Sequence, residues 1–492
     1  MGKVQEWIDS VTGPATDWLS SINDWFYTWV ILIVLVGTGV LLTMLTKGVQ
    51  FRLFGDMFRH LIRSRGGAQG GISSFQAFAI GMATRIGIGN ITGVALAIVL
   101  GGPGALFWMW LVAFFGMATA FAEATLAQIF KVRHPDGTFR GGPATYILHG
   151  LKSHKLAVAF AVCMIFSMVF AMPMVQSNTI AGVFQNAHGV DTWITAVVCA
   201  VLVALVLLGG VRGIAAATEW ISPLMAIFYI AIAIIVVAMN ASAIPTFFSD
   251  VFLSAFGLRE ALAGTAGGIM AAILNGVRRG LFSNEAGMGT NPNAAATATV
   301  SHPVQQGLIQ SFGVFLDTVL VCTSTGFIIL TSGAADWKTA TAEQSAHMTT
   351  DAITATLGSW MAIPVSIMIF FFGFSSILGA YAYAEANLVF LKGSKNAEIA
   401  MRVVSIATTG LGAILALPFV WTLMDTAMAV ITIINLVAVL SLVKWTTAVL
   451  RDFERQRKAG AHIPVFDPAT AELPGEFRSN AWTSSSPTTV EG

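Results

Sequence analysis

The segment Gly81–Asn90 places glycines beside Thr, Arg and Asn inside an otherwise apolar stretch of membrane-spanning length. A helix in a bilayer satisfies its own backbone hydrogen bonds, so this composition predicts a break that lines a polar cavity. The amides of Gly87, Ile88 and Gly89 would begin a half-helix and could donate to a carboxylate. The Asn90 amide oxygen is a neutral ligand that sodium accepts. Close helix packing is the other common use of Gly-x-Gly in membranes.

A second polar pair stands in the apolar segment near residues 358–391. Ser375 and Ser376 place two adjacent hydroxyls among Ile, Phe and Ala. Serines in membrane helices often bond back to their own carbonyls, and that interpretation stays open here.

Charged residues gather in a second glycine-rich segment, 276–289, which we predict to be another interrupted helix. It contains Arg278, Arg279, Ser283, Asn284 and Glu285. Charge within a membrane is rare unless it is paired or faces water. We therefore expect Glu285 to pair with Arg278 or Arg279, either as a gate or as a contact that fixes helix packing.

Three further charges lie inside apolar spans. Arg85 falls within the first break, while Glu123 and Asp317 stand in two other spans. Arg85 could pair with either carboxylate or contact the substrate, and the sequence does not choose among these. All three are candidate gate or internal ion-pair residues.

The composition sets these residues in a membrane. Hydrophobic residues make up 55% of the chain and charged residues 10%, with a mean hydropathy of +0.76. These values exceed what a soluble core needs and predict an all-α polytopic membrane protein. No nucleophile and base pair or metal-spaced His and Asp set lies on one helical face. We expect no enzyme activity and no nucleic-acid partner, and there is no Walker-type motif for ATP.

Counting segments of about 20 apolar residues predicts about eleven transmembrane helices. They lie near residues 25–47, 74–100, 104–130, 156–184, 191–210, 213–240, 262–290, 303–331, 358–391, 399–419 and 422–447. One extra helix precedes ten core helices, whose first and sixth members are the two interrupted ones. Because each set of five is odd in number, the second set is inverted relative to the first, as in secondary transporters.

The predicted organisation follows from these spans. An interfacial helix over 1–24, interrupted by Pro14, precedes the extra transmembrane helix at 25–47. The repeats cover 74–240 and 262–447, and a tail over 459–492 is expected to be disordered. Lys and Arg gather in the loops after the first and third spans and near the C-terminus. We expect the protein to lie in the plasma (inner) membrane. The positive-inside rule then places its N-terminus outside and its C-terminus in the cytoplasm.

The chain resembles a known family. The block Gly101–Trp110 followed by Gly116 is similar to the signature of the alanine/glycine:cation symporters, the sodium:alanine symporter family. Three further blocks agree, namely residues 87–95, 279–287 and 374–379. The resemblance runs from about residue 25 to about residue 450. It implies a fold of the leucine-transporter type, sodium as the coupling ion and a small neutral amino acid as substrate, with no other cofactor.

The same resemblance implies two sets of site residues. Sodium would be held by Ala83, Ile86, Phe372, Ser375 and Ser376. The substrate would be bound by Gly87, Ile88, Gly89, Asn90, Gln176, Phe282, Ser283 and Ala380, with Phe282 as a lid. Two positions depart from the family pattern. Ile88 replaces a hydroxyl residue, and Ala380 replaces a bulky aromatic residue, which could enlarge the pocket.

The sequence therefore predicts a secondary active transporter that couples sodium to small neutral amino acids by alternating access. Alanine and glycine are the first expected substrates, with serine or a larger solute such as glutamine as alternatives. An uncoupled or proton-coupled facilitator or channel is the second hypothesis, although pores favour continuous water-lined passages and charged rings. The expected partners are the solute, sodium and the bilayer, and we expect a functional monomer.

Overall fold

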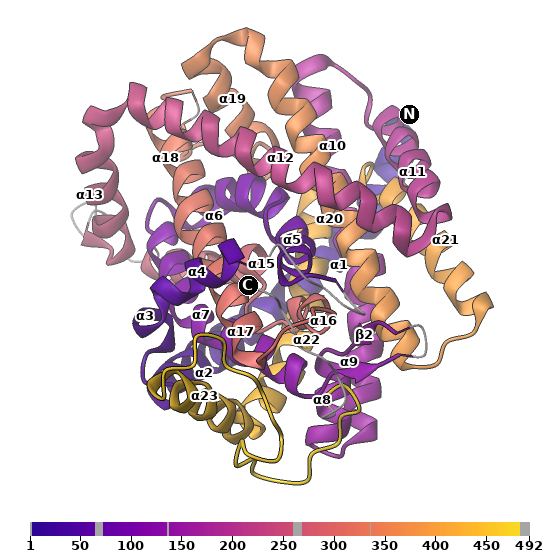
Figure 1. Ribbon diagram of the computed structural model, residues 1–492. Helices are drawn as coiled ribbons and strands as arrows, with labels where there is room; N and C mark the ends of the chain where they lie inside the picture. Colours follow the sequence, from indigo (N-terminus) through magenta and orange to yellow (C-terminus); the bar gives the residue numbers. More distant parts are fainter. Residues whose placement is uncertain (1, 64–71, 135–136, 259–267, 335, 483–492) are drawn as a thin grey trace.

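The computed structural model describes residues 2–63, 72–134, 137–258, 268–334 and 336–482. These residues form a helical bundle with one two-stranded antiparallel hairpin, β1 (Val132–Arg133) and β2 (Phe139–Arg140) (Figure 1). Figure 1 also shows α12, α13 and α19 at the end of the bundle opposite α23.

The first half of the chain contains helices as far as residue 255. Their bounds are α1 (Gly2–Phe26), η1 (Tyr27–Ile31), α2 (Leu32–Leu45), α3 (Val49–Arg52), α4 (Phe54–Arg63), α5 (Ser74–Arg85), η2 (Gly89–Gly93), α6 (Val94–Gly101), α7 (Ala105–Ile129), α8 (Pro143–Gly150), α9 (His154–Phe166), η3 (Ser167–Ala171), α10 (Met172–His188), α11 (Thr192–Leu208), α12 (Gly210–Met239), η4 (Ala241–Ala243) and α13 (Ile244–Ala255).

The second half begins its described helices at residue 268. Their bounds are α15 (Gly268–Asn284), α16 (Asn291–Ala295), α17 (Pro303–Val314), η5 (Phe315–Cys322), α18 (Thr323–Thr331), α19 (Ser345–Leu357), η6 (Ser359–Met361), α20 (Ala362–Phe390), α21 (Lys395–Gly412), α22 (Leu417–Ser441) and α23 (Val443–Lys458).

Six helical runs in the described residues are long and apolar enough to cross a membrane, or up to eight if each bent pair is one span. The bent pairs are residues 74–85 with 89–101, which turn by 49°, and residues 224–239 with 241–255, which turn by 79°. The chain is therefore a multi-pass membrane protein. The predicted number of eleven helices stays a prediction.

The N-terminal run differs from the expected division. α1, η1 and α2 continue one another from Gly2 to Leu45, and Pro14 lies inside α1. The expected interruption at Pro14 is wrong, and no helix boundary separates 1–24 from 25–47. A proline inside a helix removes one hydrogen bond but does not by itself end the helix when neighbouring contacts hold it.

The two interrupted helices meet in the middle of the bundle. The first breaks between Arg85 and Gly89, within the segment expected to be interrupted. The second breaks at 285–290, at the end of the predicted segment 276–289, because 276–284 is helical. The residues at that break, Glu285, Gly287 and Gly289, have φ of 56°, 97° and 77°, which is the left-handed region that ends a helix.

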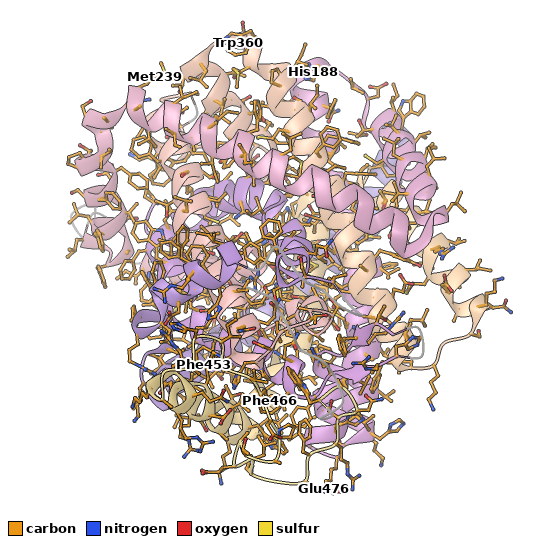
Figure 2. All side chains as sticks on the ribbon, viewed as in Figure 1. His188, Met239, Trp360, Phe453, Phe466 and Glu476 are labelled. Atoms are coloured by element: carbon orange, nitrogen blue, oxygen red, sulfur yellow. The ribbon has the colours of Figure 1, made fainter. Side chains whose placement is uncertain are left out.

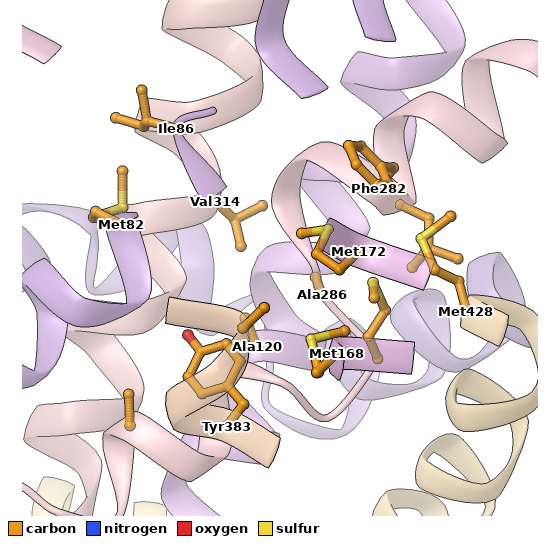
Figure 3. Close-up of a cluster of buried hydrophobic side chains, with 14 of the residues drawn as sticks. Met82, Ile86, Ala120, Met168, Met172, Phe282, Ala286, Val314, Tyr383 and Met428 are labelled. Carbon is orange, nitrogen blue, oxygen red and sulfur yellow. The ribbon is translucent and has the colours of Figure 1, made fainter. Parts of the chain in front are cut away.

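In the core, helices from the first half of the chain pack against helices from the second half. α7 contacts α17, α10 contacts α20, and α6 contacts α15. Around the breaks, buried apolar side chains from several helices meet, among them Met82, Met172 and Phe282 (Figure 3). Many polar side chains are buried there as well, and buried polar groups need hydrogen-bond partners within the protein.

The tail is not disordered where the structure describes it. Residues 459–482 lie against the bundle, and Phe466, Ala471 and Ala481 are buried. The prediction is wrong for this segment because its composition is polar while its few apolar side chains find a matching surface. Residues 483–492 and the expected start of the span at 262 lie outside the described residues.

Candidate functional site

At the first break, the backbone amide of Gly87 is hydrogen-bonded to a nearby side chain. α5 ends at Arg85, Ile86 is extended with φ −75° and ψ 92°, and the helix resumes at Gly89. The Gly87 N–H donates to Asn90 Oδ1 at 2.9 Å. The expectation that Gly87 keeps a free amide is therefore wrong, and the Asn90 oxygen already has a donor.

A cluster of neutral oxygens joins α5 to α20 beside this break. Ser376 Oγ donates toward the carbonyls of Ala83, at 3.2 Å, and Phe372, at 2.9 Å. Ser375 Oγ lies 3.1 Å from the same Phe372 carbonyl. A Cβ at residue 87 would collide with Ser376 Oγ, so only glycine allows this close approach. The structure thus brings together four of the five predicted sodium ligands, and Ile86 adjoins them at the end of α5.

On the other side of the break, Asn90 joins a buried carboxylate. Asn90 Nδ2 donates to Asp317 Oδ1 at 2.6 Å and lies 3.2 Å from Ser283 Oγ. Ser283 Oγ and Thr318 Oγ1 donate to Asp317 Oδ2 at 2.5 and 2.8 Å. Both interrupted helices and η5 therefore meet at Asp317, which is fully buried.

An aromatic pair covers the resumed half of the first helix. The rings of Phe282 and Trp421 have centroids 4.8 Å apart. A Cβ at residue 89 would lie 2.8 Å from the Phe282 ring, so the ring rests on the backbone of Gly89. Phe282 is 3% exposed and Trp421 is 2% exposed, so both rings belong to the closed interior.

The arginines of α15 pair differently from the prediction. Arg279 forms an ion pair with Asp425 of α22 and lies 4.5 Å from the Trp421 ring centroid. Arg278 pairs with Asp24 of α1 at 2.6 Å. Glu285 pairs with neither, because α15 continues through residue 284 and the two arginines lie more than a turn before the break. The prediction of a Glu285–arginine pair is wrong.

The second break is anchored by Glu123 of α7. Its carboxylate accepts the N–H of Gly287 at 3.1 Å and of Gly289 at 3.2 Å. Asn435 Nδ2 also donates to it, and to the Gly287 carbonyl at 2.9 Å. Glu123 therefore replaces the helical partners that these amides lose where α15 unwinds.

Arg85 has no direct ion pair within the described residues. Its Nη1 donates to the carbonyl and Oε1 of Gln310 at 3.1 and 3.3 Å, and its Nε and Nη2 are buried without a hydrogen-bond partner. The carboxylate of Glu285 instead accepts from Thr290 at 2.7 Å and Asn291 at 2.9 Å. Among the described residues, Arg85 forms no direct ion pair with Glu123 or Asp317, which were two of the partners left open by the sequence.

Gln176 and Ala380 are both buried. Gln176, on α10, lies 3.3 Å from Met172 Sδ through Nε2, and its Oε1 has no partner among the described residues. Ala380 is fully buried on α20, one turn after Ser376. Ile88 is likewise fully buried, between Gly87 and Gly89.

Sequence reasoning missed Trp421 and Asp425. Asp425 carried a usable signal, since it is a lone carboxylate inside the apolar span predicted at 422–447. Trp421 carried none, because a tryptophan near a predicted helix end is ordinarily an interfacial residue.

The geometry joins two interrupted helices to neutral oxygens, buried charges and an aromatic cover. The profile of the sodium:alanine symporter family matches residues 13–468. This chain belongs to the sodium:alanine symporter family. It is thus a transporter of the symporter class rather than an enzyme.

Two relatives of this symporter-family chain match along most of its length. The "Sodium/alanine symporter AgcS" of Methanococcus maripaludis is 37% identical over 446 residues, which cover 89% of this chain and 97% of AgcS. The "Probable sodium/glutamine symporter GlnT" of Bacillus subtilis is 42% identical over 445 residues, covering 90% and 91%. Sodium is therefore the coupling ion that family membership supports.

A solved structure agrees on the fold. The crystal structure of MhsT in complex with L-phenylalanine superposes with a TM-score of 0.57 at 13% identity, covering 78% of this symporter-family chain and 93% of MhsT. At this identity the similarity concerns the fold alone. It confirms the leucine-transporter type that the resemblance implied.

Proposed function

We propose that this protein couples one sodium ion to the movement of a small neutral amino acid by alternating access. The observation that carries the proposal is the bridge from Ser376 Oγ to the carbonyls of Ala83 and Phe372. It joins an interrupted helix to an intact one through oxygens that carry no formal charge.

Sodium would lie among the carbonyls of Ala83, Ile86 and Phe372 and the hydroxyls of Ser375 and Ser376. In the structure the Ser376 hydroxyl donates toward the carbonyls of Ala83 and Phe372. A bound cation would instead accept coordination from the hydroxyl oxygen and the carbonyl oxygens at the same time. Because the ligands come from both α5 and α20, binding would stabilise the contact between these helices.

The substrate carboxylate would be bound at the start of the resumed helix. The Gly87 amide is occupied by Asn90, so we assign the donor role to the amides of Ile88 and Gly89. The ammonium group would reach the unwound carbonyls of 285–290. The unpartnered Oε1 of Gln176 is a further acceptor.

The apolar part of the solute would lie against Ile88, Phe282 and Ala380. Phe282 with Trp421 forms the cover, and the small side chain of Ala380 leaves room on α20. We propose alanine, glycine and serine as substrates. Glutamine is the larger alternative, which the name of the relative GlnT supports.

Contacts between helices of the two predicted repeats support alternating access. First, second and third core helices of one half each contact their counterparts in the other, as α6 with α15, α7 with α17 and α10 with α20. Such pairing is what an approximate two-fold relation between inverted repeats produces. We propose a monomer in the inner membrane with the N-terminus outside and the C-terminus in the cytoplasm.

The energy available suffices for accumulation. One charge moving through about 100 mV supplies about 2.3 kcal/mol. A tenfold sodium gradient adds about 1.4 kcal/mol. Together these terms concentrate a neutral zwitterion by roughly several hundredfold, whereas an uncoupled facilitator only equilibrates it.

Uptake of radiolabelled L-alanine into proteoliposomes tests the proposal. We expect accumulation above equilibrium with an inward sodium gradient and none with potassium, and Ser376→Ala should raise the sodium concentration needed for half-maximal uptake at least tenfold. Ser366→Ala is the matched control, since Ser366 is also buried on α20 but bonds His188 instead. Equal, merely equilibrating uptake in both salts would contradict sodium coupling and favour the facilitator.

A further inference from the structure

The C-terminal segment 464–482 lies across one end of the bundle. Phe453, Phe466 and Glu476 are labelled at this end, opposite His188, Met239 and Trp360 (Figure 2). We call residues 464–482 the strap. The match to the family model ends at residue 468, so most of the strap lies after the matched residues.

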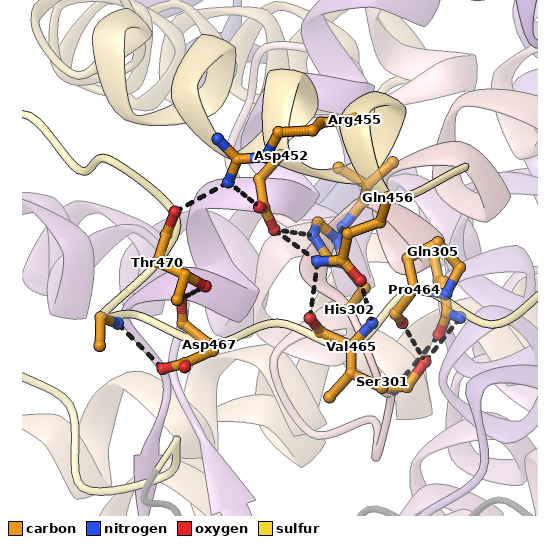
Figure 4. Close-up of polar contacts among 12 residues, drawn as sticks. Ser301, His302, Gln305, Asp452, Arg455, Gln456, Pro464, Val465, Asp467 and Thr470 are labelled. Carbon is orange, nitrogen blue, oxygen red and sulfur yellow. Dashed lines mark hydrogen bonds and ion pairs between the residues drawn. The ribbon is translucent and has the colours of Figure 1, made fainter. Parts of the chain in front are cut away.

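The first part of the strap is bound to the loop before α17 and to α23. Ser301 Oγ donates to the Pro464 carbonyl at 3.0 Å, and the Phe466 N–H donates to the Ser301 carbonyl at 2.9 Å. Gln456 and Val465 exchange two hydrogen bonds of 2.8 Å (Figure 4). These are backbone-specific contacts, so they fix the register of the strap as well as its position.

A buried histidine stands behind this attachment. His302 is fully buried, and its Nε2 lies 3.3 Å from Asp452 Oδ2 (Figure 4). Its Nδ1 accepts from the Val304 N–H at 3.2 Å, so the proton of the neutral ring is on Nε2. The Phe466 ring packs on the imidazole with centroids 5.6 Å apart.

The last part of the strap covers a buried lysine. Lys131 is 2% exposed and has no carboxylate partner among the described residues. Its Nζ donates to the Ala298 carbonyl at 2.9 Å and lies 4.2 Å from the Phe139 ring centroid and 4.7 Å from that of Trp482. Burial lowers the pKa of Lys131 well below its usual range. Without Trp482 one aromatic wall of this site would be open to water.

Trp482 also reaches the start of the first interrupted helix. Its Nε1 donates to the Gln128 carbonyl at 2.8 Å, and its ring packs with the buried cluster of Ala77, Ala298 and Val300. The chain before α5 is tied to the same loop, where the Thr299 N–H donates to the Ile72 carbonyl at 3.0 Å. α5 is the half-helix that carries the proposed sodium carbonyl of Ala83 and ends immediately before that of Ile86.

We infer that the strap is an intramolecular clamp on α5, which must release Trp482 before this half-helix can move away from the bundle and open the adjacent face. The inference rests on the proposed alternating access, because a fixed α5 would have nothing to clamp. Undocking would restore water to the Lys131 ammonium, which lowers the cost of release. The clamp would therefore act as a brake on opening at the end that we place in the cytoplasm.

A cysteine reporter tests the clamp in the full-length protein. Ala77→Cys places a thiol on a fully buried position beneath Trp482, and its rate of labelling by a membrane-impermeant maleimide is measured in vesicles open on both faces. We expect Trp482→Ala and Phe466→Ala each to raise this rate at least tenfold. The control is Arg478→Ala, since the ion pair that Arg478 forms among the described residues is with the exposed Glu476, at 2.7 Å. The parent without the reporter gives the background from the three native cysteines.

Amide hydrogen exchange separates clamping from covering. In Trp482→Ala we expect amides of 74–85 to exchange at least tenfold faster, while those of α10 stay unchanged. Equal labelling in all variants, or an equal rise in Arg478→Ala, would overturn the inference. So would faster exchange spread over α10, or unchanged exchange in α5. None of these readouts needs transport, so a protein that fails the sodium uptake test still decides whether the clamp exists.

Discussion

Removing the charge of Glu123 is the sharpest test of how the second break is held. The carboxylate accepts two backbone N–H groups, from Gly287 and Gly289, and a third donor from Asn435. In Glu123→Gln the side chain keeps its shape but has one acceptor oxygen, and its new NH₂ group faces donors. At least one buried N–H of the unwound segment then loses its partner.

The magnitude follows from the hydrogen bonds. A hydrogen bond to a charged group contributes about 1.5–3 kcal/mol, and an unsatisfied buried donor costs about 1–3 kcal/mol. We therefore expect Glu123→Gln to destabilise the native break by about 2–4 kcal/mol. Because each 1.4 kcal/mol is about tenfold in an equilibrium constant, even half of this energy expressed in substrate binding weakens it about fivefold to thirtyfold.

Equilibrium binding of labelled alanine in saturating sodium is the assay, together with amide exchange of residues 285–290. The matched control is Glu398→Gln, which removes the same charge from a partly exposed pair with Arg402. A surface pair of this kind contributes at most about 1 kcal/mol, so binding should stay within twofold of the parent. If Glu123→Gln binds as the parent does and 285–290 exchanges no faster, the carboxylate does not hold the break.

Two other predictions concern the first break and the strap. Gly87→Ala should abolish sodium-stimulated uptake because its Cβ would collide with Ser376 Oγ. In the control Gly410→Ala, the new Cβ would lie 3.8 Å from its nearest neighbour, and uptake should stay within twofold of the parent. Equal effects of the two substitutions would contradict the close approach of Gly87 to Ser376. Burial lowers the pKa of His302, against the opposing effect of its hydrogen bond to Asp452. When the strap is undocked, His302 has its ordinary pKa of about 6.5 and binds more protons than in the docked state. Strap docking is therefore strongest above that pH, and it weakens as the pH falls below it. Amide exchange of 464–482, corrected for its intrinsic pH dependence, should be faster at pH 5.5 than at pH 7.5 in the parent, and this difference should vanish in His302→Gln.

The position of the first break could be read from the sequence because its cause is local. Glycines beside Asn90 and Thr84 weaken a helix at that point whatever surrounds it. The second break was predicted only as a segment, 276–289, because glycines such as Gly276 and Gly280 do not by themselves say where a helix ends. In the structure both stay helical, since each faces α7 closely, and the chain unwinds only where Glu123 supplies acceptors.

The partners of the charges were beyond sequence reasoning. Arg278 meets Asp24, 254 residues away, and Arg279 meets Asp425, 146 residues away. Neighbouring charges such as Glu285 were the natural candidates by distance along the chain. Helix direction decides the matter, because it turns the arginines toward α1 and α22, while Glu285 lies more than a turn further along, at the start of the break.

By itself the sequence determined that this is a helical membrane protein of the sodium:alanine symporter family, since hydropathy, composition and the glycine-rich blocks are properties of short segments. The tertiary structure alone decided that Asn90 occupies the Gly87 amide, that Trp421 covers Phe282, and that the tail docks beside Lys131. These are contacts between segments far apart in the chain. Their energy depends on which groups are left unsatisfied when the helices pack, and no local pattern contains that information.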